Sequence, residues 1–66
     1  MNIFVNGTRH EVPPGTTVAS LLSRLEMTAK HLAVEVNLQL VPRTAHAGHT
    51  LAEADRLEIV TLVGGG

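Results

Sequence analysis

The chain opens with an apolar run, Ile3–Val5, and a mainly polar run, Thr8–Val12, and Asn6-Gly7 separates these two strand-like segments. Asn and Gly both tolerate the positive φ angles of a type I′ turn, so this pair predicts a two-residue β-hairpin loop. Such a loop pairs Val5 with Thr8 and fixes the register of the two strands. Side chains alternate between the faces of a sheet. One face therefore carries the residues Met1, Ile3, Val5, His10 and Val12, and the other carries Phe4 and Arg9.

A helical period follows the Pro13-Pro14-Gly15 break. The apolar residues recur at i, i+3, i+4 and i+7, namely Val18, Leu21, Leu22 and Leu25. This spacing places them on one stripe of an α-helix. Thr16 or Thr17 is a suitable N-cap. We expect a helix over about residues 17 to 26 that packs its apolar stripe on a sheet.

The second half of the chain predicts three more strands. Residues 32–36 alternate large apolar residues with small or charged ones, and a short strand at 40–41 is limited to a sheet edge by Pro42. We expect residues 43–55 to be irregular, with a helical turn around 44–47. The last strand has two faces. One carries Leu57, Ile59, Thr61 and Val63, and the other carries Glu58, Val60 and Leu62.

This order of elements predicts an α+β fold of the ubiquitin-like β-grasp type. Its mixed sheet has one main helix packed on one face, and the first and last strands run parallel at the centre. We expect residues 1–63 to form the domain and residues 64–66, Gly64-Gly65-Gly66, to form a flexible C-terminal tail. The last strand then delivers the tail outward from the domain.

The composition argues against nucleic acids and membranes as partners. The net charge is −1, with five basic and six acidic residues, and Phe4 is the only aromatic residue. Nucleic-acid binding by phosphate neutralisation and base stacking is therefore not expected. No apolar run approaches the roughly 20 residues of a membrane span. Because the first residues also lack the features of a signal peptide, we expect a cytoplasmic protein with no membrane association.

Candidate metal and acid–base residues lie in the expected loop. His46 and His49 are three residues apart, and Glu53 and Asp55 follow. A zinc site needs three or four convergent ligands, and the chain has no cysteine, so we predict no metal site. Glu53 and Asp55 are interpreted as solvated loop charges rather than an acid–base pair. His10 is interpreted as a histidine at the rim of the core.

The outer sheet face carries the apolar residues Phe4, Ala33, Val60 and Leu62. Because the first and last strands are expected to be neighbours, we predict that Phe4, Val60 and Leu62 cluster beside the tail. Exposed apolar patches often mark protein-binding surfaces. These three residues are therefore the predicted docking site for a partner.

These features together resemble the ThiS/MoaD family of sulfur carriers, and its ThiS branch more closely. The resemblance covers the whole chain and rests on the opening Ile3–Gly7, the helix entry Gly15–Val18, Val36-Asn37, Val41-Pro42-Arg43 and the terminal glycines. The chain departs from the family pattern at Leu38, where many relatives carry glycine. It departs again at Ala45-His46, which replaces a bulkier acidic–aromatic pair.

The resemblance implies a function for the glycines. A ubiquitin-activating-type, ThiF-like adenylyltransferase is expected to use ATP to form an acyl-adenylate on Gly66, and a persulfide donor then supplies the sulfur of a thiocarboxylate. The recipient is expected to be a ThiG-like thiazole synthase in thiamin biosynthesis. Gly66 is thus the sulfur attachment site, and Gly64 and Gly65 give it access. The chain is expected to be a protein substrate rather than an enzyme, and to bind no cofactor.

Three alternatives stay open at this point. A MoaD-like carrier delivers the same thiocarboxylate to the large subunit of a molybdopterin synthase. A noncatalytic ubiquitin-like binding module only docks and does not need its terminal glycines. A protein modifier is conjugated to lysines of other proteins. An enzyme in its own right is the least favoured class.

Overall fold

The computed structural model describes residues 1–62, and these residues form one mixed five-stranded sheet with a single α-helix. The strands lie in the order β2-β1-β5-β3-β4. The strands are β1 (Asn2–Val5), β2 (Thr8–Glu11), β3 (Leu32–Val36), β4 (Gln39–Val41) and β5 (Arg56–Thr61). The helices are α1 (Val18–Arg24) and two 3₁₀ helices, η1 (Ala29–His31) and η2 (Arg43–Gly48).

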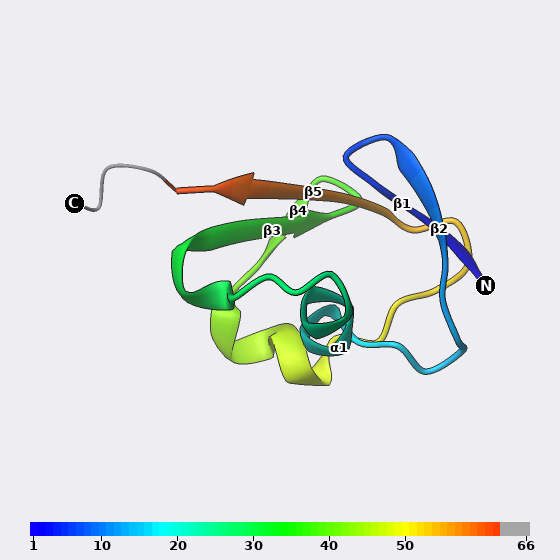
Figure 1. Ribbon diagram of the computed structural model, residues 1–66, viewed down its shortest axis with the longest axis horizontal. Helices are drawn as coiled ribbons and strands as arrows, with labels where there is room; N and C mark the ends of the chain where they lie inside the picture. Colours follow the sequence, from blue (N-terminus) through cyan, green and yellow to red (C-terminus); the bar gives the residue numbers. More distant parts are fainter. Residues whose placement is uncertain (63–66) are drawn as a thin grey trace.

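The topology confirms the predicted β-grasp fold. β5 occupies the centre of the sheet, runs parallel to β1 and runs antiparallel to β3. Helix α1 and η2 lie together on one side of the sheet (Figure 1). The opposite side of the sheet is not covered by a helix in the described part of the chain. Within residues 1–62, no helix is long and apolar enough to cross a membrane.

The first hairpin has the predicted register. Val5 pairs with Thr8, and Ile3 pairs with His10. Asn6 and Gly7 have φ angles of 49° and 84°, the left-handed conformations that a type I′ turn requires. The Asn-Gly pair therefore determines which residues of this hairpin face the helix.

Helix α1 ends at Arg24 and is shorter than predicted. Glu26 has a positive φ of 58°, so the helix does not continue through it. Thr17 is the N-cap. Its hydroxyl accepts a hydrogen bond from the Ser20 amide at 3.1 Å, and the Ser20 hydroxyl accepts one from the Thr17 amide at 2.8 Å. This reciprocal capping box satisfies two amides that have no partner inside the helix.

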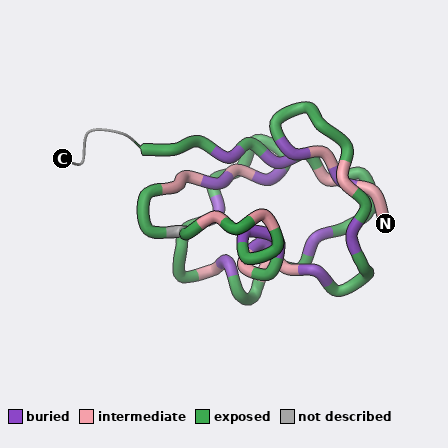
Figure 2. The backbone as a smooth tube through the Cα atoms, viewed as in Figure 1, coloured by how far each residue is buried: buried purple, intermediate pink, exposed green. Residues whose placement is uncertain are grey.

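The core lies between α1 and the inner face of the sheet (Figure 2). Leu21 is fully buried and Leu22 is 3% exposed, as the apolar stripe predicts, whereas Leu25 is only half-buried. The strands contribute every second residue to this core. The buried strand residues are Ile3, Val5, Val34, Val36, Val41, Leu57 and Ile59.

Strand β4 begins at Gln39, one residue before the prediction, because the turn is tighter than expected. Asn37 and Leu38 have φ angles of 51° and 69° and form a two-residue connection between β3 and β4. Leu38 thus adopts a left-handed conformation that normally favours glycine. Its side chain is 88% exposed.

The segment after β4 is more ordered than predicted. η2 covers residues 43–48 rather than a single turn at 44–47. His46 is only 4% exposed, so it belongs to the interior rather than to a loop surface. The next residues are tied to the start of α1, since the Val18 amide donates to the His49 carbonyl at 3.0 Å.

Candidate functional site

Strand β5 lies at the centre of the sheet and ends at Thr61, one residue before the last described residue. Its end is attached to the segment before β3, because the Leu62 amide donates to the His31 carbonyl at 2.7 Å. Val63 and the predicted tail residues Gly64, Gly65 and Gly66 lie outside the described residues. Their assignment as access residues and sulfur attachment site stays a prediction.

Both neighbours of β5 hold it in place as far as Ile59. β3 pairs with it from Val36, opposite Leu57, to Leu32, opposite Thr61. On the other side, the pairing with β1 ends at Val5 and Leu57. The Asn6 side chain then continues the ladder, because it donates to the Ile59 carbonyl at 3.1 Å and accepts from the Ile59 amide at 2.8 Å.

The predicted cluster of Phe4, Val60 and Leu62 is wrong in its placement. Phe4 pairs with Arg56, at the start of β5. Val60 lies four residues further along the strand, or about 13 Å away at roughly 3.3 Å per residue. The Arg56 guanidinium lies over the Phe4 ring, 4.9 Å from its centroid. Alternation correctly predicted the shared face but could not predict the register of two strands so distant in sequence.

A different apolar group lies near the end of β5, and we call it the outer patch: Ala33, Val60 and Leu62. Val60 and Leu62 are each 54% exposed, and Ala33 pairs with Val60 across the sheet. Leu40 is 65% exposed on edge strand β4. The sequence pattern predicted Leu40 in a strand but did not assign it to this face. Its pairing with Glu35 supplies that information.

Two carboxylates lie within the same face. Glu35 and Glu58 occupy directly opposed positions on β3 and β5, and Leu40 pairs with Glu35 on the next strand. Like charges opposite one another weaken a sheet. The outer face therefore combines exposed apolar side chains with a pair of directly opposed like charges.

The histidines and loop carboxylates do not converge. Within residues 1–62, no group of three His, Asp or Glu side chains could hold a metal ion. Glu53 accepts a hydrogen bond from the Asn2 amide at 3.0 Å. Asp55 accepts from the Asn37 side chain at 2.9 Å and from the Ala52 amide at 2.8 Å. Both carboxylates lie in the loop before β5, as predicted. Glu53 is exposed and Asp55 is half-buried, and each also accepts a hydrogen bond from a backbone amide.

A family model described as the ThiS family matches residues 3–66. The chain belongs to the ThiS family. Within that family, the crystal structure of the thiamine biosynthesis protein ThiS from Geobacter metallireducens superposes on this chain with a TM-score of 0.87. The two chains are 33% identical, and the match covers all of both.

Two other relatives differ in how much of their own length this chain covers. The sulfur carrier protein ThiS of Escherichia coli is 30% identical to this ThiS-family chain over 66 residues, which is all of both proteins. A thiazole synthase of Paramagnetospirillum magneticum is 36% identical over the same 66 residues. Those residues are 20% of the synthase, so the chain spans only a fifth of that relative.

Proposed function

We propose that this ThiS-family chain is a sulfur carrier for the thiazole branch of thiamin biosynthesis, and that the Gly66 carboxylate carries the sulfur. The main support is the family match, which continues through residue 66. The E. coli relative, similar over its whole length, is named a sulfur carrier. A segment similar to this chain also occurs within a thiazole synthase, which favours that enzyme class as the recipient.

The chemistry begins with activation, because a carboxylate is a poor electrophile. In the proposed first step, a Gly66 oxygen attacks the α-phosphorus of ATP on a ThiF-like, ubiquitin-activating-type enzyme, and pyrophosphate leaves. A persulfide sulfur then attacks the acyl carbon and AMP leaves. A thiol supplies the two electrons that break the remaining sulfur–sulfur bond. The thiocarboxylate that results is the sulfur donor for a ThiG-like thiazole synthase.

The chain itself contributes position rather than catalysis in this proposal. β5 is bonded on both sides up to Ile59, so it presents the residues that follow it from a fixed point. Gly64 and Gly65 lack a Cβ and let the backbone enter a narrow enzyme channel. The chain is thus a protein substrate that acts in the cytoplasm. ATP is bound by the activating partner and not by the carrier.

The outer patch is the proposed docking surface for these partners. It lies on the sheet face that α1 and η2 leave open, and Leu62 is also the last described residue before the tail. One partner can therefore contact the patch and receive the tail together. Phe4 lies at the other end of β5 under Arg56, so it offers a second and separate contact point.

Intact-mass spectrometry tests the proposal. The chain is incubated with ATP, a ThiF-like enzyme and a persulfide source, and the expected product replaces one oxygen by sulfur at Gly66. Omission of ATP is the control and should leave the mass unchanged. Transfer is then measured by adding either a thiazole synthase or a molybdopterin synthase large subunit. An unchanged mass in the complete reaction, or transfer only to the molybdopterin enzyme, contradicts the proposed function.

A further inference from the structure

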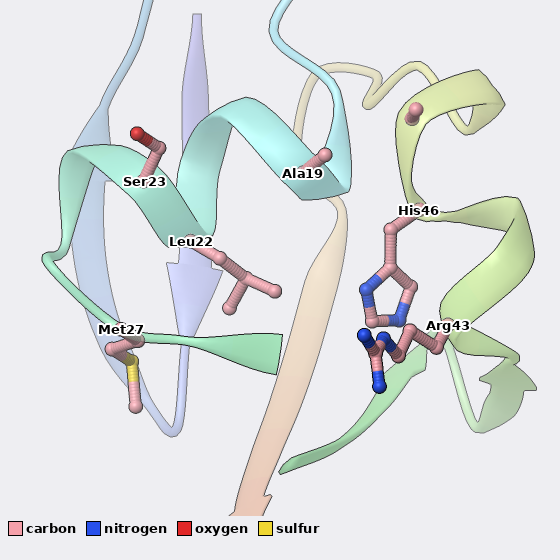
Figure 3. Close-up of a pocket in the computed structure, with 7 residues that line it drawn as sticks. Ala19, Leu22, Ser23, Met27, Arg43 and His46 are labelled. Atoms are coloured by element: carbon pink, nitrogen blue, oxygen red, sulfur yellow. The ribbon is translucent and has the colours of Figure 1, made fainter. Parts of the chain in front are cut away.

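A pocket of about 330 Å³ lies between α1 and η2, on the side of the sheet opposite the outer patch (Figure 3). Leu22 and Ala19 of α1 and Met27 after it form its apolar wall, and Arg43 and His46 of η2 line the other side. The volume is at the lower end of the range typical of small-molecule sites. None of the residues in this pocket has a part in the proposed sulfur transfer.

His46 has an unpaired acceptor at this pocket. Its Nε2 lies 3.0 Å from the Val41 carbonyl oxygen, which can only accept, so Nε2 carries the proton. In the neutral ring Nδ1 is then a lone-pair acceptor. Nδ1 is buried and has no hydrogen-bond partner among residues 1–62. Buried polar atoms are nearly always paired, so this one indicates a missing donor.

The direction of the ring relates this acceptor to the pocket. The His46 ring is turned toward α1, and the Leu22 side chain points at it from across the pocket (Figure 3). Nδ1 is sealed from solvent in this arrangement. An occupant of the pocket therefore reaches Nδ1 only when the side chains that line the pocket move. The neighbouring Met27, with its three rotatable bonds, is suited to adapting to such a change.

The remaining groups define the occupant. Arg43 is exposed at the pocket and carries a permanent positive charge with several N–H donors, so it favours an anionic group. His46 Nδ1 requires a donor such as a hydroxyl group. Leu22 and Met27 require an apolar body. We propose that the pocket binds a small organic anion whose hydroxyl group donates to His46 Nδ1 and whose anionic group pairs with Arg43.

An NMR titration of the intact chain tests this site with defined probes. The probes are 3- and 4-hydroxybenzoate, with benzoate as the matched compound that lacks the donor and phenol as the one that lacks the charge. The tighter hydroxybenzoate should bind about fivefold more strongly than benzoate, the effect of one net hydrogen bond. The Leu22 methyl resonances should shift during the titration. Equal affinities for hydroxybenzoate and benzoate, unmoved Leu22 methyl resonances, or no binding of any probe would overturn the proposal.

Variants separate the two polar contacts. Arg43→Gln should weaken hydroxybenzoate and benzoate by the same factor and leave phenol unaffected. His46→Phe keeps an aromatic ring but removes the acceptor, so hydroxybenzoate should then bind no better than benzoate. Arg24→Gln, at the exposed end of α1 and outside the pocket, is the matched control and should change nothing. If His46→Phe does not fold, the probe comparison in the parent chain and Arg43→Gln still decide. Unequal losses for the two benzoates in Arg43→Gln would contradict the assigned pairing.

Discussion

The two faces of the sheet are built from alternate residues of the same strands, yet they differ in the exposure and the charge of their side chains. On the inner face, Ile3 and Val34 are fully buried and Leu57 is 1% exposed under α1. On the outer face, Val60 is 54% exposed, and Glu35 and Glu58 stand directly opposite each other. A one-residue slip of any strand would exchange these faces.

This difference suggests that the inner face stabilises the domain and that the outer face is available for partner binding. The inner face supplies the apolar burial that a domain of 66 residues needs, because the chain has no cysteine and no metal-binding group within residues 1–62. The outer face keeps apolar and charged side chains that do not contribute to that core. We expect substitutions on the inner face to change the free energy of unfolding, and substitutions on the outer face to change partner binding instead.

The largest effect is expected for the truncation of a core leucine. Leu21→Ala removes a fully buried side chain and should lower the free energy of unfolding by about 2–5 kcal/mol. Leu40→Ala is the matched control, since the same side chain is 65% exposed there and its loss should cost about 0.5 kcal/mol or less. Urea denaturation measures both. Similar costs for the two variants would contradict the assignment of the faces.

A smaller effect of opposite sign is expected at the turn between β3 and β4. Leu38 has a φ of 69° and is 88% exposed, so its side chain brings strain without burial. Leu38→Gly should raise the free energy of unfolding by about 0.5–1 kcal/mol, because glycine adopts this conformation freely. Leu38→Ala keeps the Cβ and should bring no gain. A stabilised alanine variant in thermal denaturation would show that backbone strain is not the cause.

The smallest stability effect is expected on the outer patch. Val60→Lys should change the free energy of unfolding by about 0.5 kcal/mol or less, because the side chain is already half exposed. Binding to a thiazole synthase should weaken about tenfold if Val60 is a docking contact. Thr61→Lys, the next residue on the same strand and on the other face, is the matched control. Equal affinities of the two variants, measured calorimetrically, would exclude Val60 as a contact.

Local patterns predicted the parts of the fold that depend on neighbouring residues. Asn6-Gly7 predicted the hairpin register because only a few residue pairs suit a type I′ turn. The leucine spacing predicted the buried stripe of α1 because the helical period places residues i, i+3, i+4 and i+7 on one side of a helix. The tight turn at Leu38 was not predicted, because leucine does not normally mark a residue of positive φ.

Three features that the sequence did not reveal have separate physical causes. Phe4 lies beside Arg56 rather than Val60 because of the parallel register of β1 and β5, which no local pattern encodes. His46 is interior because its ring reaches the Val41 carbonyl, so spacing alone could not distinguish it from a loop histidine. The capping box was missed because its N3 residue is Ser20 rather than the usual Glu or Gln.

We propose that residues 1–62 hold the fold whereas Gly64, Gly65 and Gly66 carry the chemistry. ATP–pyrophosphate exchange with a ThiF-like enzyme, measured on the parent and on Gly65→Val, tests this claim most directly. The added side chain should block close approach of the backbone, so exchange should fall sharply, while the free energy of unfolding should change by about 0.5 kcal/mol or less. Exchange at the parental rate in Gly65→Val would contradict the account.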